Sequence, residues 1–200
     1  PPTTPRRQRQ MCIRDRKGGR GDHDVSQIHV IGAGTMGGDI AAVAAMSGFE
    51  VTLQDISADA VDRAIERART LYERRLKAPQ KVEAAMARLR ADAGGEGLAS
   101  ADLLIEAVAE DLVIKKAVFA DAESKMKPGA IMATNTSAIP LEDIGAALNN
   151  PARLIGMHFF NPVPVLPLVE VVYTDASDGS FVDRAMYVCG ALKKLSLIHI

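Results

Sequence analysis

The chain has 200 residues, 48% of them hydrophobic and 24% charged, and its formal net charge is −1. These values are ordinary for a globular protein with one substantial core, and they leave little room for two full domains. The balanced charge gives no reason to expect nucleic acid or an anionic membrane as a partner, and no stretch reaches the ~18 consecutive apolar residues of a membrane span. With only two cysteines, Cys12 and Cys189, no disulfide framework is expected, so we predict a reducing compartment, the bacterial cytoplasm.

Both ends of the chain are set aside in the functional interpretation. Residues 1–24 are basic, glycine-rich and proline-bearing, which is typical of a segment that cannot bury enough apolar surface to order itself. Residues 11–16 resemble translated sequencing adapter, and residues 195–200 have the same look. We therefore predict a disordered or artefactual tail at 1–24, one folded domain at 25–194 and an artefactual end at 195–200. The alternative is a disordered tail and, at 195–200, the first residues of a genuine strand; in either case we expect the natural protein to extend further at both ends.

The most informative stretch begins with the apolar run Ile28–Ile31, which has the length and β-branched content of a buried parallel strand. The pattern Gly-x-Gly-x-x-Gly follows at once, and a helical apolar face comes after it. A strand, a glycine turn and a helix in this order predict a dinucleotide site, with the helix N-terminus facing the phosphates. The three glycines are expected to allow, in turn, a tight turn, close approach of a pyrophosphate, and close helix–strand packing. The cofactor-binding residues predicted in this turn are Gly32, Gly34, Thr35, Met36 and Gly37.

The second half of this signal is Asp55, at the end of the strand pattern over 51–55. An acid in this position accepts hydrogen bonds from the adenosine ribose hydroxyls and repels a 2′-phosphate. Ile56 and Ser57 follow, with no arginine beside the acid, so we predict NAD rather than NADP. The alternative, a glycine-rich turn without a ligand, does not account for an acid at the spacing that this one function requires.

The rest of the chain alternates helical and strand patterns. Helices are predicted from 57 or 58 to Pro79 and over 82–89, 112–127, 140–148 and 178–192, and strands over 102–108, 130–133, 154–158 and 168–173. The last strand follows three prolines and alternates weakly, so we predict an antiparallel edge strand. This order implies an α/β, Rossmann-type doubly wound and mostly parallel sheet with right-handed crossovers. The arginine-rich face of the first long helix is most simply a solvated surface, and contact with an acyl-CoA phosphate is the alternative.

Polar side chains stand where the predicted strands end, and ligands bind at this edge of such sheets. These residues are Glu110, Asn135, Ser137, His158 and Asn161. His158 is the acid–base candidate, because imidazole titrates closest to neutral pH. If the proline-rich turn folds the next strand back, Glu170 accepts the imidazole N–H and stabilises the imidazolium.

Each candidate also has a plainer interpretation. A strand-end histidine alone is more often structural, Ser137 fits a helix N-cap, and Asn161 before a proline fits the start of a turn. Lys115, on the first turn of a helix near the same crevice, fits either an anion contact or an exposed lysine. His29 is expected to be a packed or edge residue of its strand. No grouping has metal-ligand spacing, so no metal is predicted.

Taken together, these motifs resemble those of the 3-hydroxyacyl-CoA dehydrogenase family over roughly residues 25–194. The resemblance is carried by the glycine turn with Asp55, Glu106-Ala-Val-Ala-Glu110, Ala133-Thr-Asn-Thr-Ser137, His158-Phe-Phe-Asn-Pro-Val163 and Pro167-Leu-Val-Glu170. It implies a catalytic pair of His158 and Glu170, with Ser137 at the substrate oxygen. Beyond the glycine turn, NAD contacts are expected at Asp55, Glu110, Lys115, Asn135, Ser137 and Asn161.

The resemblance implies reversible, NAD-dependent oxidation of an L-3-hydroxyacyl-CoA to the 3-oxoacyl-CoA in fatty-acid β-oxidation. The wording of 133–140 and 166–170 is closer to the multifunctional β-oxidation proteins, which carry an enoyl-CoA hydratase domain upstream. The family continues into a helical domain that supplies an active-site asparagine, part of the acyl pocket and the dimer interface, and none of it follows Lys194. One alternative is therefore an NAD-binding fragment without turnover. Another is a Rossmann dehydrogenase of small hydroxy acids, which predicts a lysine base on a later helix in place of the His158–Glu170 pair.

Overall fold

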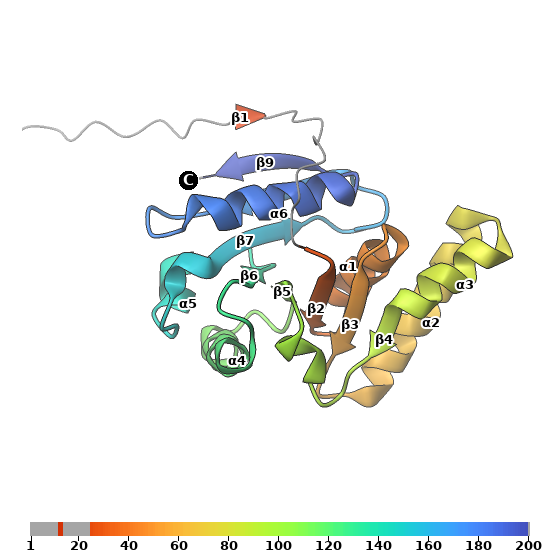
Figure 1. The fold of residues 1–200 in the computed structure, drawn as a ribbon, viewed down its shortest axis with the longest axis horizontal. Helices are drawn as coiled ribbons and strands as arrows, with labels where there is room; N and C mark the ends of the chain where they lie inside the picture. The colour runs from red at the N-terminus through yellow and green to blue at the C-terminus, as the bar shows by residue number, and fades with distance from the viewer. Residues whose placement is uncertain (1–11, 14–24, 200) are drawn as a thin grey trace, which may run out of the picture.

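A computed structural model describes residues 12–13 and 25–199, and within them nine strands form one sheet in the order β1-β9-β8-β7-β6-β5-β2-β3-β4 (Figure 1). The strands are β1 (Cys12–Ile13), β2 (Gln27–Ile31), β3 (Glu50–Gln54), β4 (Leu89–Ala91), β5 (Leu103–Glu106), β6 (Ile131–Thr134), β7 (Leu154–Phe159), β8 (Leu168–Val172) and β9 (Leu195–His199). The helices are α1 (Thr35–Met46), α2 (Ala58–Leu76), α3 (Pro79–Arg88), α4 (Leu112–Lys125), α5 (Leu141–Gly145) and α6 (Gly179–Ala191), with short 3-10 turns η1 (Glu96–Ala99) and η2 (Pro151–Arg153). Apart from β1, the predicted tail at 1–24 lies outside the described residues.

Six of the strands, β2 to β7, run parallel, which confirms the predicted Rossmann-type sheet. The chain starts in the middle with β2, builds outward through β3 and β4, and then returns to add β5, β6 and β7 on the other side of β2. The strand order therefore reverses between β2 and β5. In open sheets of this kind, ligands bind at this reversal, beyond the carboxyl ends of the strands.

The far side of the sheet departs from the prediction in one respect. β8 pairs antiparallel with β7 as predicted, but it is not an edge strand, because β9 pairs with it in parallel. The prediction of an edge position is wrong because residues 195–199, which were set aside as an artefactual end, form β9. The domain limit after residue 194 stays a prediction.

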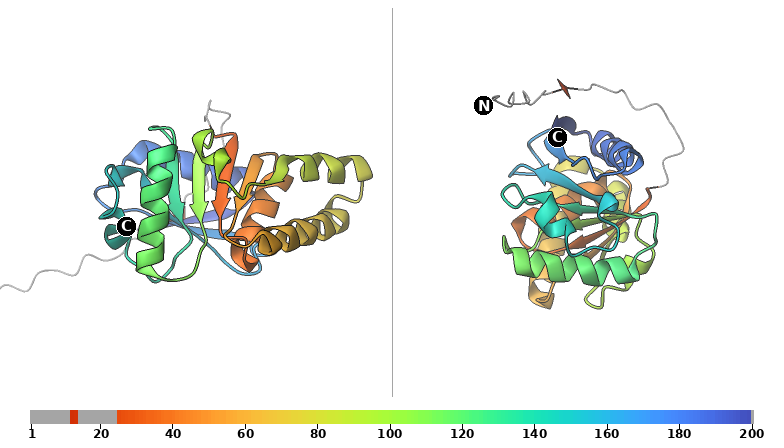
Figure 2. Two further views of the ribbon diagram at one scale, coloured as in Figure 1. Left: turned by 90° about the horizontal axis from the view of Figure 1, so that it is seen from below. Right: turned by 90° about the vertical axis from the view of Figure 1, so that its left-hand side faces the viewer.

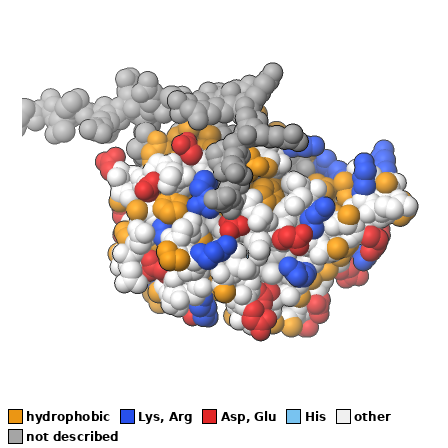
Figure 3. Space-filling model, in the orientation of Figure 1, with side chains coloured by type: hydrophobic (Ala, Val, Ile, Leu, Met, Phe, Trp, Pro, Cys, Tyr) orange, Lys and Arg blue, Asp and Glu red, His pale blue; other side chains and the backbone are white. Residues whose placement is uncertain are grey.

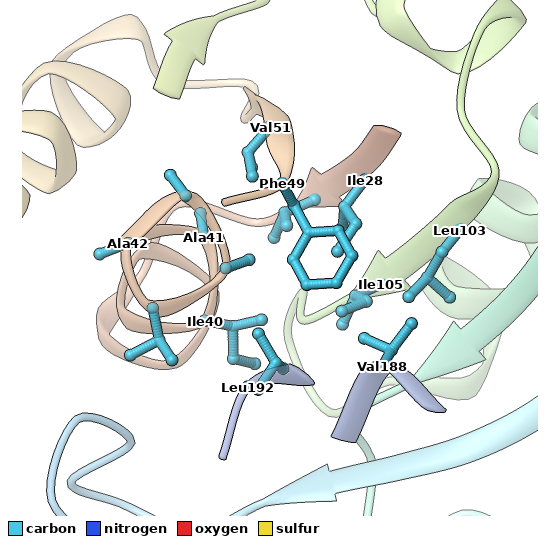
Figure 4. Packing of buried hydrophobic residues seen from close by; sticks show 14 of the residues in the cluster. Ile28, Ile40, Ala41, Ala42, Phe49, Val51, Leu103, Ile105, Val188 and Leu192 are labelled. Carbon is cyan, nitrogen blue, oxygen red and sulfur yellow. The ribbon is translucent and has the colours of Figure 1, made fainter. Parts of the chain in front are cut away.

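Side chains of the sheet alternate between two apolar layers. Leu103 and Ile105 of β5 belong to a large cluster with α1, α2, α3 and α6, whereas Leu104 between them belongs to a second cluster with α4 and α5. Figure 2 shows helices on both faces of the sheet, and Figure 4 shows Ile105, Phe49 and Val188 pointing toward one another in the larger cluster. Because both faces are covered, ligands meet the sheet at its edges.

Local signals explain where α2 begins and ends. The Ser57 hydroxyl accepts a hydrogen bond from Ala60 N at 3.3 Å, which caps the helix N-terminus. The helix ends at Lys77, whose φ of 55° is left-handed, and α3 then begins at Pro79. The two helices project from the body of the molecule as a hairpin (Figure 1). The helix predicted over 82–89 thus starts earlier, at Pro79. Its predicted last residue, Leu89, belongs instead to β4, a strand that was not predicted because the apolar spacing is helical.

The surface mixes charges of both signs, as Figure 3 shows for one face. No helix within residues 12–13 and 25–199 combines the length and the apolar character needed to cross a bilayer. Several large apolar side chains are nevertheless exposed. These are Ile56, Val113, Ile114, Val165, Leu166 and Leu195. The first five follow the carboxyl ends of β3, β5 and β7, so the exposed apolar surface is concentrated at the edge where ligands bind.

Asp102 anchors the start of the folded chain at the opposite edge. Its carboxylate accepts hydrogen bonds from Ser26 N and Gln27 N, both at 2.9 Å, and from Lys127 Nζ at 2.6 Å. Partial burial alone would raise the pKa of Asp102, but the Lys127 ammonium and the two backbone N–H groups outweigh it and hold that pKa below its ordinary 3.8.

We expect Asp102→Asn to lower the free energy of unfolding at pH 7 by about 1–3 kcal/mol, since the variant loses charge-assisted hydrogen bonds. The pKa of Asp102 is lower in the folded state than its ordinary 3.8. The carboxylate therefore gives its full stabilisation at pH values well above 3.8 and loses it as the pH falls below that value. Urea unfolding of both proteins at pH 7 and at the lowest pH where both fold measures this difference. If the difference in the free energy of unfolding between the two proteins is as large at low pH as at pH 7, the stabilising role of the Asp102 carboxylate is contradicted.

Candidate active site

Five parallel strands end side by side and place the predicted site residues along one edge. In the order β3, β2, β5, β6 and β7, the strand ends carry Asp55, the glycine turn, Glu110, the segment 135–137 and His158. The sheet thus brings the candidates into one row, from the acid that would meet a ribose to the imidazole.

The glycine turn contains two kinds of glycine. Gly32 has a φ of +106°, and a Cβ there would lie 2.5 Å from Ala107 O; a Cβ on Gly37 would lie 1.8 Å from Gly32 O. Both positions are therefore closed to any side chain by the backbone itself. A Cβ on Gly34 would meet nothing within 4 Å, and α1 starts directly behind it with no acidic residue in its first turn. Open space before an uncompensated helix N-terminus fits a pyrophosphate group.

Asp55 is held against this turn. Its Oδ2 accepts a hydrogen bond from Ala33 N at 2.6 Å, and its Oδ1 accepts one from Ser57 N at 2.9 Å. The carboxylate is half-buried, and the neighbouring Ile56 is fully exposed. An acid fixed beside the open glycine fits the ribose of a dinucleotide whose phosphates lie at the helix.

Lys115 is buried, contrary to the alternative of an exposed lysine. Its side chain is 1% exposed, and its Nζ lies 2.7 Å from Oε1 of the fully buried Glu106 and 3.4 Å from Oε2 of Glu110. Glu106 is not among the predicted site residues, although a carboxylate that ends an apolar strand requires a buried partner. A direct contact between Lys115 and the cofactor stays a prediction.

Glu110 lies in the loop after β5 and is held by two neighbours, Lys115 and Thr136. Its side chain is 46% exposed, and its carboxylate accepts a hydrogen bond from Thr136 Oγ1. Burial alone would raise the pKa of Glu110, but the Thr136 hydrogen bond and the Lys115 ammonium outweigh it and lower that pKa. Glu110 is therefore an anion at neutral pH. Thr136, absent from the sequence-based candidates, links the loop after β5 to the loop after β6.

Two predicted cofactor contacts have other positions or partners in the structure. The side-chain Oδ1 of Asn135 accepts a hydrogen bond from Phe159 N at 2.9 Å, so it ties β6 to β7. Asn161 is exposed in the loop after β7 and lies outside the residues that line the cleft described next. Their contacts with a cofactor stay predictions.

His158 and Glu170 form a pair. The register of β7 and β8 places them opposite each other, with His158 Nδ1 3.1 Å from Glu170 Oε2. Their side chains are 21% and 28% exposed, and the imidazole lies against the Phe160 ring at 4.6 Å between centroids. Both line a cleft of about 550 Å³, together with the exposed Ser137. Because a carboxylate accepts, Nδ1 carries the hydrogen and Nε2 keeps the lone pair that can take a proton.

A second histidine is structural. His29, predicted to be a packed or edge residue, is fully buried in a central strand, with Nδ1 2.7 Å from Thr52 Oγ1 and Nε2 3.0 Å from Gln54 Oε1. Burial lowers the pKa of His29 more than Gln54 and Asp92 raise it. Among residues 25–199, no three acidic, histidine or cysteine side chains are grouped so that they could hold a metal ion.

Known proteins are similar to this chain in sequence. A family model described as "3-hydroxyacyl-CoA dehydrogenase, NAD binding domain" matches residues 27–198. The chain is 42% identical over 165 residues to the 3-hydroxyadipyl-CoA dehydrogenase of Escherichia coli (strain K12), covering 80% of this chain and 35% of that protein. It is 36% identical over 183 residues to the fatty acid oxidation complex subunit alpha of Acinetobacter baylyi, covering 90% of this chain and 26% of that protein.

Several solved structures have a fold similar to that of this chain. The crystal structure of 3-hydroxybutyryl-CoA dehydrogenase from Escherichia coli K12 superposes with a TM-score of 0.84 at 39% identity, covering 88% of this chain and 38% of that one. The dehydrogenase part of multifunctional enzyme 1 from C. elegans gives a TM-score of 0.79 at 32% identity, covering 93% and 45%. The chain spans about a third or less of the length of the curated relatives named above.

Proposed function

The chain belongs to the 3-hydroxyacyl-CoA dehydrogenase family, as a match to its NAD-binding domain over 27–198, and from this premise we propose that it serves an enzyme oxidising L-3-hydroxyacyl-CoA to 3-oxoacyl-CoA. The family model indicates NAD as the cofactor. The observation that carries the proposed reaction is the His158–Glu170 pair, 3.1 Å apart on the wall of the cleft that also contains Ser137.

Different residues along the strand ends would contact different parts of the cofactor. Asp55 would accept hydrogen bonds from the adenosine ribose, and its charge disfavours a 2′-phosphate. Gly34 and the N-terminus of α1 would hold the pyrophosphate, with Thr35 and Met36 supplying helix N–H groups. The nicotinamide end would then reach the far part of the row, where Glu110, Lys115, Asn135, Ser137 and Asn161 stand. When bound, NAD supplies the acceptor for the hydride from C3 of the substrate.

The protein's own residues would handle the proton. His158 Nε2 takes the proton of the 3-hydroxyl group as hydride leaves the carbon, and Ser137 binds the same oxygen. Glu170 keeps the Nδ1–H tautomer in place and stabilises the positive imidazolium that results. Phe160 covers one side of the ring, which restricts the orientations open to the imidazole.

We further propose that this unit works within a longer protein of fatty-acid β-oxidation in the cytoplasm. The relative from Acinetobacter is named as a subunit of a fatty acid oxidation complex, and the chain matches 26% of its length. An upstream enoyl-CoA hydratase domain and a downstream helical dimerisation domain would account for the rest. Such a neighbour would also cover the apolar side chains exposed at the carboxyl edge, among them Val113 and Val165.

The test is hydride transfer from NADH to acetoacetyl-CoA by the 200-residue chain, followed by the loss of NADH absorbance. Turnover supports the dehydrogenase. Binding of NADH without turnover favours the alternative of a cofactor-binding fragment, since the proposed helical domain would supply part of the acyl pocket. A chain that binds no NADH contradicts both.

We expect Asp55→Ala to weaken NADH binding by about tenfold or more, a loss of at least ~1.4 kcal/mol, because the ribose loses its acceptor. NADPH binding should change less or improve, since the repulsion of the 2′-phosphate is gone. Fluorescence titrations with the two nucleotides measure both constants, and thermal unfolding checks that the variant folds. An unchanged preference for NADH would contradict the role of Asp55.

A further inference from the structure

The loop 106–110, between β5 and α4, is folded around a buried ammonium. Lys115 Nζ lies 2.7 Å from Glu106 Oε1, 3.5 Å from Val108 O and 3.4 Å from Glu110 Oε2. These three oxygens come from alternate positions of one short segment, so the backbone curls around the cation. The Lys115 side chain is 1% exposed and that of Glu106 is fully buried, so the pair is shielded from water.

The remaining hydrogen bonds of Glu106 are also satisfied inside the protein. Its Oε1 accepts from Val108 N at 2.7 Å, and its Oε2 accepts from Thr134 Oγ1 at 2.7 Å. The carboxylate therefore joins the end of β6 to the loop, in addition to neutralising Lys115. A fully hydrogen-bonded pair of this kind fixes one geometry of the segment that surrounds it.

One side of this loop supports the glycine turn. Ala107 N donates a hydrogen bond to Ile31 O at 2.8 Å, directly before the turn. Ala107 O would lie 2.5 Å from a Cβ on Gly32, and the Ala107 methyl group would lie 3.3 Å from a Cβ on Gly37. A shift of the loop would therefore move the backbone against which the turn is packed.

The other side of the loop reaches the segment that carries Ser137. The Thr136 hydroxyl donates a hydrogen bond to the Glu110 carboxylate. The oxygen of this hydroxyl, Thr136 Oγ1, accepts hydrogen bonds from Ala138 N at 3.3 Å and from Ile139 N at 3.2 Å. The hydroxyl of Thr136, the residue before Ser137, thus holds the backbone that follows Ser137. A chain of contacts runs from the buried ammonium to each of the two loops that border the crevice.

We propose that Glu106 and Lys115 are positioning residues of the cofactor site, and that their ion pair exists to order the crevice rather than to stabilise the fold. This inference rests on the proposed function. Replacing a buried ion pair with uncharged residues of similar volume is often neutral or stabilising, whereas removing one partner leaves a buried charge and destabilises strongly. A pair kept only for stability could therefore be replaced as a unit without loss of function.

Four variants of the 200-residue chain test this: Glu106→Gln, Lys115→Met, the double variant with both changes, and Lys116→Met. Lys116 is the next residue on the same helix, so it controls for loss of a positive charge nearby. For each protein, thermal unfolding measures stability and the fluorescence of NADH measures its dissociation constant.

We expect each single variant at Glu106 or Lys115 to lose both stability and NADH affinity. The double variant should regain the thermal midpoint of the parent chain while binding NADH about tenfold or more weakly, because nothing orders the loop and the predicted contact of Lys115 with the cofactor is also lost. Glu106→Gln is decisive for the mechanism, since it keeps Lys115 and removes only the charge that holds it. Lys116→Met should match the parent chain in both measurements.

Three outcomes would overturn the inference. A double variant that recovers NADH affinity together with stability shows a purely structural pair. A double variant that does not fold shows that the fold itself requires the charges. Normal NADH affinity in Glu106→Gln shows that Lys115 needs no partner to serve the site. If the parent chain binds no NADH, the proposed function fails first, so the two failures are distinguishable.

Discussion

We expect the replacement of His158 with alanine to lower kcat of the proposed dehydrogenase by about 10²–10⁴-fold, the range expected for loss of a general base. The imidazole lines the cleft, and Glu170 sets its orientation, with Oε2 3.1 Å from Nδ1. Steady-state oxidation of a 3-hydroxyacyl-CoA measures the effect. A loss of less than tenfold would count heavily against the assignment.

NADH affinity serves as the control for this variant. His158 lies at the end of β7, away from the glycine turn at the end of β2, so the predicted contacts with the ribose and pyrophosphate remain and the dissociation constant should change far less than kcat. Glu170→Gln adds a second check, because it retains a hydrogen-bond acceptor but removes the charge that stabilises the imidazolium. We expect a smaller fall in kcat than for His158→Ala and a changed pH profile.

The second large effect is a contrast between two glycines of one turn, Gly37 and Gly34, when each is replaced with alanine. Gly37→Ala places a Cβ 1.8 Å from Gly32 O, a clash with backbone that only a displacement of α1 relieves. We expect a loss of about 3 kcal/mol in the free energy of unfolding, at the upper end for overpacking, together with loss of NADH binding.

Gly34→Ala should behave in the opposite way. Its φ of −61° suits alanine and its Cβ meets nothing within 4 Å, so stability should stay the same or rise by about 0.4–1 kcal/mol. NADH binding should nevertheless weaken by about tenfold or more, because the methyl group occupies the space of the pyrophosphate.

Gly129→Ala is the matched control for this pair. A Cβ there also meets nothing within 4 Å, but Gly129 precedes β6 and lies at the opposite edge of the sheet. It should leave NADH binding unchanged. Equal NADH affinity in Gly34→Ala and Gly129→Ala would contradict the placement of the phosphates.

Much of the fold followed from local patterns in the sequence. The parallel strands are apolar runs buried on both faces, and the helices between them carry clear caps and breakers such as Ser57 and Pro79. The turn glycines are predictable because the turn requires residues without a Cβ, and only glycine lacks one. β4 was missed because Leu89 continues the helical apolar spacing of 82–89, and pairing with β3 makes Leu89–Ala91 a strand.

The candidate site was predictable in its placement and in the contact between His158 and Glu170, but its other hydrogen bonds were not. Strand ends gave the row from Asp55 to His158, since parallel strands share one carboxyl edge. The partner of Lys115 was not predictable from spacing, because Glu106 reaches it through the fold of a loop. For the same reason Asn135 was not foreseen as a link to Phe159 N, and Thr136 was not foreseen as a partner of Glu110.

We propose that NAD lies across the carboxyl edge of the sheet and ends beside the imidazole. A crystal structure of the chain with NADH bound would show where each part of the cofactor lies. We expect the adenosine ribose at Asp55, the pyrophosphate over Gly34, and the nicotinamide in the cleft between Ser137 and His158. A dinucleotide bound elsewhere, or one whose nicotinamide points away from His158, would contradict it.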